Sequence, residues 1–149
     1  MNNENVGLQD RVDISDLLAK YVWAYDCRQY EEVGKVFLPD GILESPGRFQ
    51  VKGRKKIVEW LREHVESKHS TKVMQHVISH SRYFTVGDEI RVYSYWMVPA
   101  REDVSKPECV IGNFGWSEDT VVKKEGAWLI KKRYFTTGVP KSFPWEDIA

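Results

Sequence analysis

Hydrophobic positions in the first part of the chain recur at helical spacing. From Ile14 to Tyr25 the apolar side chains fall three or four residues apart, which places them on one stripe of an α-helix. This spacing predicts a helix over residues 8–27, with Asp26 near its C-terminal end. The stripe consists of Ile14, Leu17, Leu18, Tyr21, Val22 and Tyr25. Both of its tyrosines are therefore expected to point inward.

Two further helices and a short hairpin are predicted next. The turn sequence Pro39-Asp40-Gly41 ends the second helix, and Pro46-Gly47 joins two strand-like pieces. Gly53 then precedes a third segment with helical spacing. The predicted elements are a helix over 29–38, strands over 42–45 and 49–52, and a helix over 54–67.

From residue 72 onward the pattern is that of long β-strands, separated by the turn sequences Gly87-Asp88 and Glu125-Gly126 and a loop at Ser105-Lys106-Pro107. Three helices followed by long antiparallel strands indicate an α+β fold, with the helices on one face of a strongly curved mixed or antiparallel sheet. Such a sheet encloses a conical pocket, which is a default place for a ligand. The predicted strands cover 72–86, 89–102, 108–122 and 127–136.

The end of the chain is irregular and rich in aromatic residues. We expect residues 1–149 to form a single domain, with 138–149 as a C-terminal tail. The tail contains Phe143 and Trp145, and such side chains need a surface to pack on. That surface belongs either to the same domain or to a neighbouring subunit.

Composition narrows the class of partner. The chain has 149 residues, of which 22 are Lys or Arg and 22 are Asp or Glu, so its formal net charge is zero. Nucleic acids and anionic membranes attract proteins with a basic excess, so neither is an expected partner. No apolar run is long enough for a membrane helix, and Met1–Asn5 lacks the features of a signal peptide. Because Cys27 and Cys109 read as reduced thiols, we expect a cytoplasmic protein.

Basic residues gather on the last predicted hairpin. Exposed positions on a terminal hairpin explain this cluster without a nucleic-acid site. The cluster consists of Lys123, Lys124, Lys131, Lys132 and Arg133.

The four histidines do not form a metal site by their spacing. His76 and His80 lie four residues apart on a predicted strand, which separates them by about 13 Å, too far for one metal ion. His64 and His69 lie in or just after a charged helix and are expected to be solvated. We expect no metal site and no cofactor.

Four segments of the chain together resemble a known family. The resemblance covers about residues 8–138 and is closest to the SnoaL-like group of the nuclear-transport-factor-2-like fold. That group includes scytalone dehydratase, bile-acid dehydratase and hexachlorocyclohexane dehydrochlorinase. The resemblance implies a cone of curved sheet and helices, a fold that carries several unrelated functions. The segments are Ile14–Asp26, Val36–Gly41, Gln75–Ile78 and Lys123–Trp128.

The resemblance also implies a site. Lyases of the family use an aspartate at the end of the first helix and a histidine on the first long strand, and these positions hold Asp26 and His76 here. A tyrosine five residues before the aspartate, or directly before it, recurs as well, so Tyr21 and Tyr25 are candidates. In this scheme Asp26 orients His76, His76 is the base, and Tyr21 stabilises an enolate. Without the resemblance, the same residues read as an exposed turn aspartate, a core histidine and core-filling tyrosines.

Other positions depart from the family pattern. Ser94 and Ser117 stand where scytalone dehydratase has a second histidine and an asparagine, and Glu44–Ser45 replaces an expected tyrosine. The expected substrate is therefore a small hydrophobic or aromatic molecule other than scytalone. Candidates for the pocket wall, beside simple packing, are Tyr25, Trp96, Asn113, Phe114 and Trp116.

The expected function is that of a cofactor-independent lyase, a dehydratase of a small cyclic or polyketide-like carbonyl compound. One alternative is a ketosteroid-isomerase-like isomerase or cyclase, in which Glu44 or Asp26 would be the base. Another is a non-catalytic small-molecule-binding or accessory protein. The resemblance further implies a homo-oligomer, with a trimer favoured over a dimer.

Overall fold

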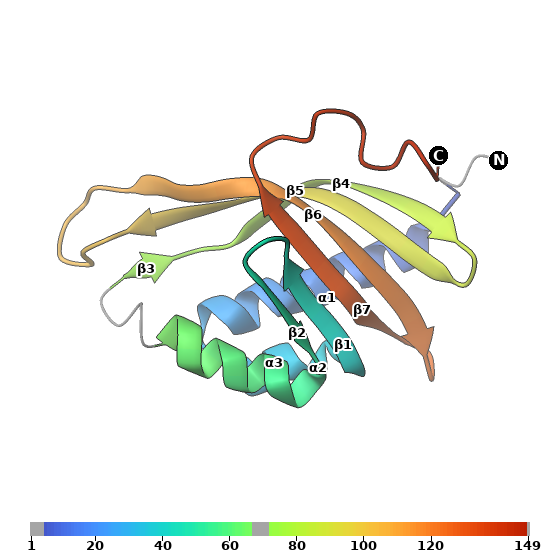
Figure 1. The fold of residues 1–149 in the computed structure, drawn as a ribbon, viewed down its shortest axis with the longest axis horizontal. Helices are drawn as coiled ribbons and strands as arrows, with labels where there is room; N and C mark the ends of the chain where they lie inside the picture. Colours follow the sequence, from blue (N-terminus) through green and yellow to red (C-terminus); the bar gives the residue numbers. More distant parts are fainter. Residues whose placement is uncertain (1–4, 67–71, 149) are drawn as a thin grey trace.

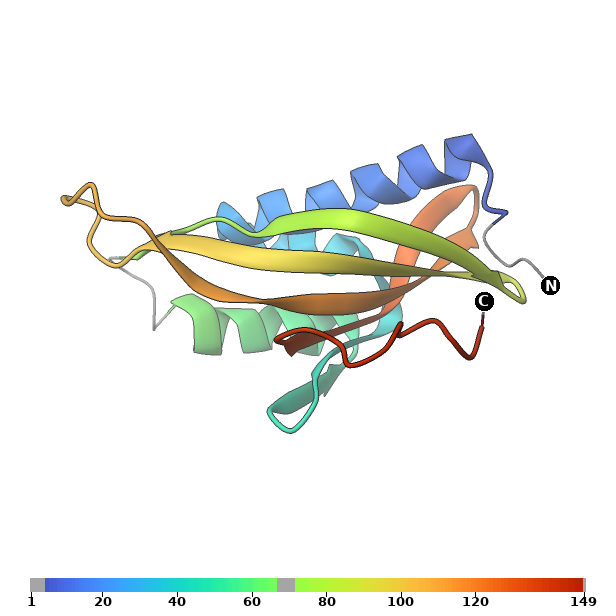
Figure 2. The same cartoon turned by 90° about the horizontal axis from the view of Figure 1, so that it is seen from above.

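A single curled sheet with helices against its inner face forms the body of the molecule (Figures 1 and 2). The structure is a computed structural model and describes residues 5–66 and 72–148. The helices are α1 (Leu8–Asp26), α2 (Tyr30–Lys35) and α3 (Arg54–Leu61), which continues into a π-helical turn, η1 (Arg62–Glu66). The strands are β1 (Phe37–Ser45), β2 (Phe49–Lys52), β3 (Val73–Met74), β4 (Val77–Val86), β5 (Glu89–Arg101), β6 (Val110–Lys124) and β7 (Ala127–Thr137).

The sheet is mixed. Its strand order is β2-β1-β7-β6-β5-β3, and β4 also pairs with β5. Strands β4 to β7 are antiparallel neighbours, whereas β1 runs parallel to β7. The predicted α+β cone is confirmed.

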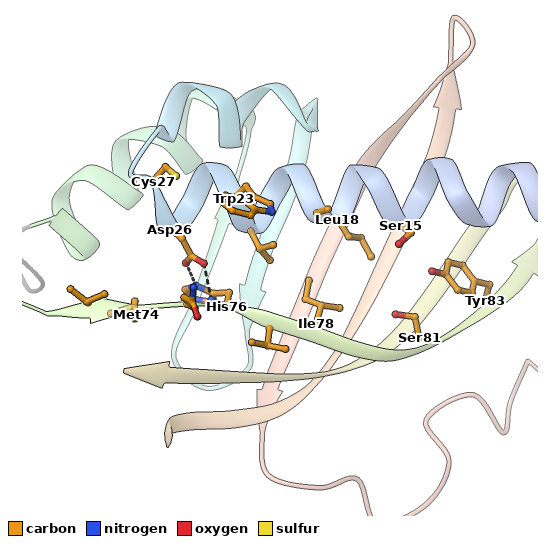
Figure 3. A pocket seen from close by; sticks show the side chains of 15 residues that line it. Ser15, Leu18, Trp23, Asp26, Cys27, Met74, His76, Ile78, Ser81 and Tyr83 are labelled. Atoms are coloured by element: carbon orange, nitrogen blue, oxygen red, sulfur yellow. Dashed lines mark hydrogen bonds and ion pairs between the residues drawn. The ribbon is translucent and has the colours of Figure 1, made fainter. Parts of the chain in front are cut away.

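Helix α1 forms where the apolar stripe predicted it. Its stripe is buried against the sheet, with Ile14 and Leu18 almost without solvent exposure. The helix ends at Asp26, and the next residues leave helical geometry, with Arg28 at a positive φ of 57°. This ending directs the Asp26 side chain toward the start of β4 (Figure 3).

The second helix is shorter than predicted, and the following strand begins earlier. Helix α2 ends at Lys35, and Pro39-Asp40-Gly41 lies inside β1 rather than in a helix-ending turn. Distant partners hold this segment extended. Ile130 N–H donates to Val36 O at 2.8 Å, and Gly53 N–H donates to Gly41 O at 2.7 Å. Turn chemistry alone could not reveal pairing with the last strand of the chain.

The strand predicted over 72–86 is interrupted twice. It divides into β3 and β4, with Gln75 and His76 between them. A bulge between Ser79 and Arg82 then breaks the alternation, and His80 in that bulge has a φ of 55°. His76 is therefore outside regular strand structure, and His80 is exposed.

The aromatic tail packs on the outer face of the sheet of its own chain (Figure 1). The Trp145 ring stacks on buried Phe84 at 5.5 Å between centroids, and it also contacts Tyr93 and Phe143. Of the two surfaces predicted for the tail, the structure shows the one on the same domain. None of the helices in the described ranges has the length and hydropathy of a membrane span.

Candidate active site

The end of α1 and the break between β3 and β4 bring Asp26 and His76 together (Figure 3). Asp26 Oδ1 lies 2.6 Å from His76 Nδ1, and Asp26 Oδ2 accepts the His76 backbone N–H at 2.8 Å. Both side chains are mostly buried, with 18% of Asp26 and 22% of His76 exposed. The carboxylate thus holds both the backbone and the ring of the histidine.

These two hydrogen bonds assign the tautomer of His76. An ionised carboxylate only accepts hydrogen bonds, so the hydrogen is assigned to Nδ1 and the lone pair to Nε2. No described residue hydrogen-bonds to Nε2. The Tyr25 ring stands edge-on to the imidazole, 4.4 Å between centroids, and limits its rotation. The ring is thereby oriented with a free basic nitrogen.

His76 borders a cavity of about 610 Å³ on the inner face of the sheet. One wall is aromatic, because Phe49 packs on Trp60 at 4.2 Å and on Phe135 at 5.8 Å between centroids. Trp96 continues this wall through its contact with Phe135. The wall suits a flat ring system.

Three of the five predicted wall residues line this cavity and two do not. Tyr25, Trp96 and Asn113 contribute to its surface. Phe114 and Trp116 lie on the outer face instead, because side chains alternate along β6 and Asn113 faces inward. Phe114 is 54% exposed, and the Trp116 ring packs on Tyr134 beside the tail.

Tyr21 and Arg133 form the polar base of the cavity. Arg133 Nη1 lies 2.7 Å from both oxygens of Asp119, and its guanidinium is 4.5 Å above the Tyr21 ring. Burial raises the pKa of the Tyr21 hydroxyl, so it keeps its proton at neutral pH and can donate a hydrogen bond. Burial likewise raises the pKa of Tyr25.

Arg133 is a site residue whose place in the basic cluster predicts an exposed position. It is 4% exposed, unlike the neighbouring lysines of the basic cluster. A bulge at Lys131 shifts the register between β6 and β7, which turns Arg133 to the same side as Ile130. The feature that could have revealed the burial of Arg133 is Asp119, an acidic residue at an inward position of β6 and directly opposite Arg133.

The residues that replace family positions do not reach the cavity. Glu44 does not line it and pairs with Lys132 at 2.6 Å. The hydrogen bond from Lys132 lowers the pKa of Glu44, which makes it a weaker base. Ser94 and Ser117 are buried directly opposite each other on β5 and β6, also outside the cavity lining.

A second hollow lies on the other side of the Asp26–His76 pair. It has a volume of about 590 Å³ between α1 and the edge strand β4, and Figure 3 shows its lining. Asp26 borders this second hollow, whereas His76 and Ile78 border both hollows. The Asp26–His76 pair therefore lies between the two hollows.

The other histidines lie apart from this pair. His64 stacks on Trp60, and its Nδ1–H donates to Trp60 O at 3.0 Å. His80 contacts Tyr95 on the outer face, and His69 lies outside the described residues. Within residues 5–66 and 72–148, no three His, Cys, Asp or Glu side chains converge as metal ligands would.

Comparison with solved structures shows the same fold in proteins of low sequence identity. ActVI-ORFA from Streptomyces coelicolor is 20% identical with a TM-score of 0.78, over 88% of this chain and 98% of the other. A Catenulispora acidiphila protein in complex with S-DNPA is 21% identical with a TM-score of 0.77, over 88% and 95%. A scytalone dehydratase candidate from Novosphingobium aromaticivorans is 24% identical with a TM-score of 0.74, over 93% and 89%.

No curated protein sequence matches the chain. The model of the SnoaL-like domain, however, matches residues 7–134, most of the chain. The chain therefore belongs to the SnoaL-like domain family, which includes polyketide cyclases and dehydratases.

Proposed function

We propose that the protein is a cofactor-independent lyase that dehydrates a small cyclic or polyketide-like carbonyl compound. The proposal rests on one observation. The Asp26 carboxylate accepts hydrogen bonds from the His76 ring Nδ1–H at 2.6 Å and from its backbone N–H at 2.8 Å, beside a cavity of about 610 Å³. A histidine held in this way can serve as a general base with its free nitrogen.

The proposed reaction begins at a carbon next to the substrate carbonyl. His76 Nε2 takes the proton from that carbon, and the electron pair moves into the carbonyl to form an enolate. Asp26 stabilises the resulting imidazolium. The neutral Tyr21 hydroxyl and the Arg133 guanidinium, both on the cavity wall, stabilise the enolate oxygen.

The second half of the reaction removes water. The enolate electrons form the new carbon–carbon double bond while the hydroxyl on the β-carbon departs. The His76 imidazolium returns its proton to that hydroxyl, so the products are an unsaturated carbonyl compound and one water molecule. The base is then ready for another cycle.

The isomerase alternative requires a carboxylate base at the substrate. Glu44 does not line the cavity, and both Asp26 oxygens already accept hydrogen bonds from His76. Neither carboxylate is free to take a proton from a ligand in the inner cavity. These contacts favour the lyase over an isomerase with a carboxylate base.

A fused-ring β-hydroxy ketone tests the proposal. Loss of water from 3-hydroxy-1-tetralone gives an enone that tautomerises to 1-naphthol, which is followed by fluorescence and identified by mass. We expect the wild-type protein to form 1-naphthol and His76→Ala to lose that activity. His80→Ala is the matched control, since it removes an exposed histidine that does not line the inner cavity.

The product separates the alternatives. A product of unchanged mass would support an isomerase or cyclase. Saturable binding without any turnover would support a binding protein. Turnover that survives in His76→Ala would remove His76 from the mechanism.

A further inference from the structure

The inner cavity has basic side chains on its wall and no carboxylate among the described residues. Arg48, Lys72 and Arg133 all contribute to its lining, whereas no described aspartate or glutamate does. The chain as a whole has a formal net charge of zero. The positive wall is therefore a local property of this cavity.

The three basic groups differ in how far they are neutralised. Arg133 is paired with buried Asp119. Lys72 Nζ lies 2.7 Å from Glu102, whose side chain is 67% exposed. An ion pair with such a solvent-exposed partner is weak. Arg48 forms no ion pair with any described residue. The uncompensated charge thus lies at Arg48, with Lys72 on the same wall.

Arg48 is placed where a ring-bound substituent would meet it. It precedes Phe49 in the chain, and its own N–H donates to Ser45 O at 3.0 Å in the turn between β1 and β2. The Phe49 ring begins the aromatic wall through its contact with Trp60. Arg48 is exposed and also lines the cavity next to Phe49, so its guanidinium can reach a substituent on a ligand at this wall, and its planar fork of donors matches a carboxylate.

We propose that this cavity binds an aromatic or fused-ring molecule that carries an anionic group of the carboxylate type, and that Arg48 binds this group with the help of Lys72. The inference names the substrate class of the lyase and rests on the proposed function in that respect only. The binding preference itself requires no turnover.

Two fluorescent probes that differ by one anionic group test the inference. These are 8-anilino-1-naphthalenesulfonate, in which the sulfonate represents the anion, and neutral N-phenyl-1-naphthylamine. We expect wild type to bind the anionic probe more tightly, and Arg48→Gln to weaken it by about fivefold or more while the neutral probe is unaffected. Added salt should weaken only the anionic probe.

Arg62→Gln is the matched control, because it removes the same charge from an arginine that pairs with Glu31 and does not line the cavity. The inference would be overturned if wild type bound both probes equally well or bound neither. It would also be overturned if Arg48→Gln and Arg62→Gln lost equal affinity for the anionic probe. A loss of both probes in Arg48→Gln would overturn it as well. If the protein dehydrates its substrate but shows no preference for the anionic probe, only the anion preference is wrong. If it prefers the anionic probe but does not dehydrate the substrate, only the lyase proposal is contradicted.

Discussion

At the scale of single residues, the Asp26 carboxylate occupies an unfavourable position that its partners compensate. The negative end of a helix disfavours a carboxylate by roughly 0.3–1 kcal/mol. Here one oxygen accepts the His76 ring N–H and the other accepts its backbone N–H. Hydrogen bonds to a charged group contribute about 1.5–3 kcal/mol each, which outweighs the dipole. The two hydrogen bonds from His76 therefore stabilise the carboxylate at this position.

Removal of Asp119 should strongly destabilise the fold. Asp119 is fully buried and accepts both hydrogen bonds from Arg133 Nη1, so Asp119→Ala leaves a buried guanidinium without its counter-charge. The expected loss in the free energy of unfolding is about 3–5 kcal/mol, measured by urea denaturation. The double variant Asp119→Leu/Arg133→Met should recover most of this loss. A single variant as stable as wild type would mean that the pair is not buried as described.

The hydroxyl of Tyr21 should matter for turnover and that of Tyr25 much less. Tyr21→Phe removes a donor at the base of the cavity, next to Arg133, and should lower kcat by about 10²-fold or more. Tyr25→Phe keeps the ring that packs against His76 and should change kcat little. The comparison uses initial rates of naphthol formation. Equal losses in both variants would contradict the assigned roles.

At the scale of elements, the break between β3 and β4 creates the site. The His76 N–H leaves the sheet to reach Asp26, whereas the preceding Gln75 N–H still donates to Pro99 O on β5 at 3.1 Å. One residue thus leaves a strand that its sequence pattern would have continued. The geometry of the site depends on where this strand stops.

Hydrogen exchange can detect this local arrangement. Asp26→Ala removes the acceptor of the His76 amide, so that amide should exchange faster by about tenfold or more. The Gln75 amide serves as the internal control, because its acceptor on β5 is unchanged. Unchanged exchange at His76, measured by NMR, would show that Asp26 does not hold the segment.

The limits of the sequence prediction follow from the same elements. Local periodicity predicted helix α1, and turn composition predicted the β4–β5 and β6–β7 turns. The family resemblance predicted that Asp26 and His76 lie close together. The start of β1, the break at His76 and the bulge at Lys131 were not predicted. Each depends on a partner far along the chain, and a shift of one residue reverses the face of every later side chain. This is why Arg133 was missed.

At the scale of the whole molecule, the two faces of the sheet differ in what they present. The inner face bears the cavity, whereas the outer face carries the aromatic tail and, beyond it, exposed apolar side chains. Met97 and Phe114 are cross-strand neighbours there, with 40% and 54% exposure, and Val77 pairs with Met97. Exposed apolar neighbours of this kind favour association.

We propose that the protein is a homo-oligomer, with a trimer favoured over a dimer. The outer apolar residues Val77, Met97 and Phe114 are candidates for the contact. Phe114→Lys should shift the mass measured by light scattering toward that of the 17.4 kDa monomer. Lys124→Glu, on an exposed position at the end of β6, is the control and should leave the assembly intact. A wild-type mass equal to the monomer would contradict oligomerisation.

The most direct test of the central claim is a double-mutant cycle on the Asp26–His76 pair, with dehydration of 3-hydroxy-1-tetralone as the readout. If Asp26 acts through His76, Asp26→Asn and His76→Ala should each lower kcat by about 10²- to 10⁴-fold, and the double variant should lose little more than His76→Ala alone. Full activity in either single variant, or losses that multiply in the double variant, would contradict the account.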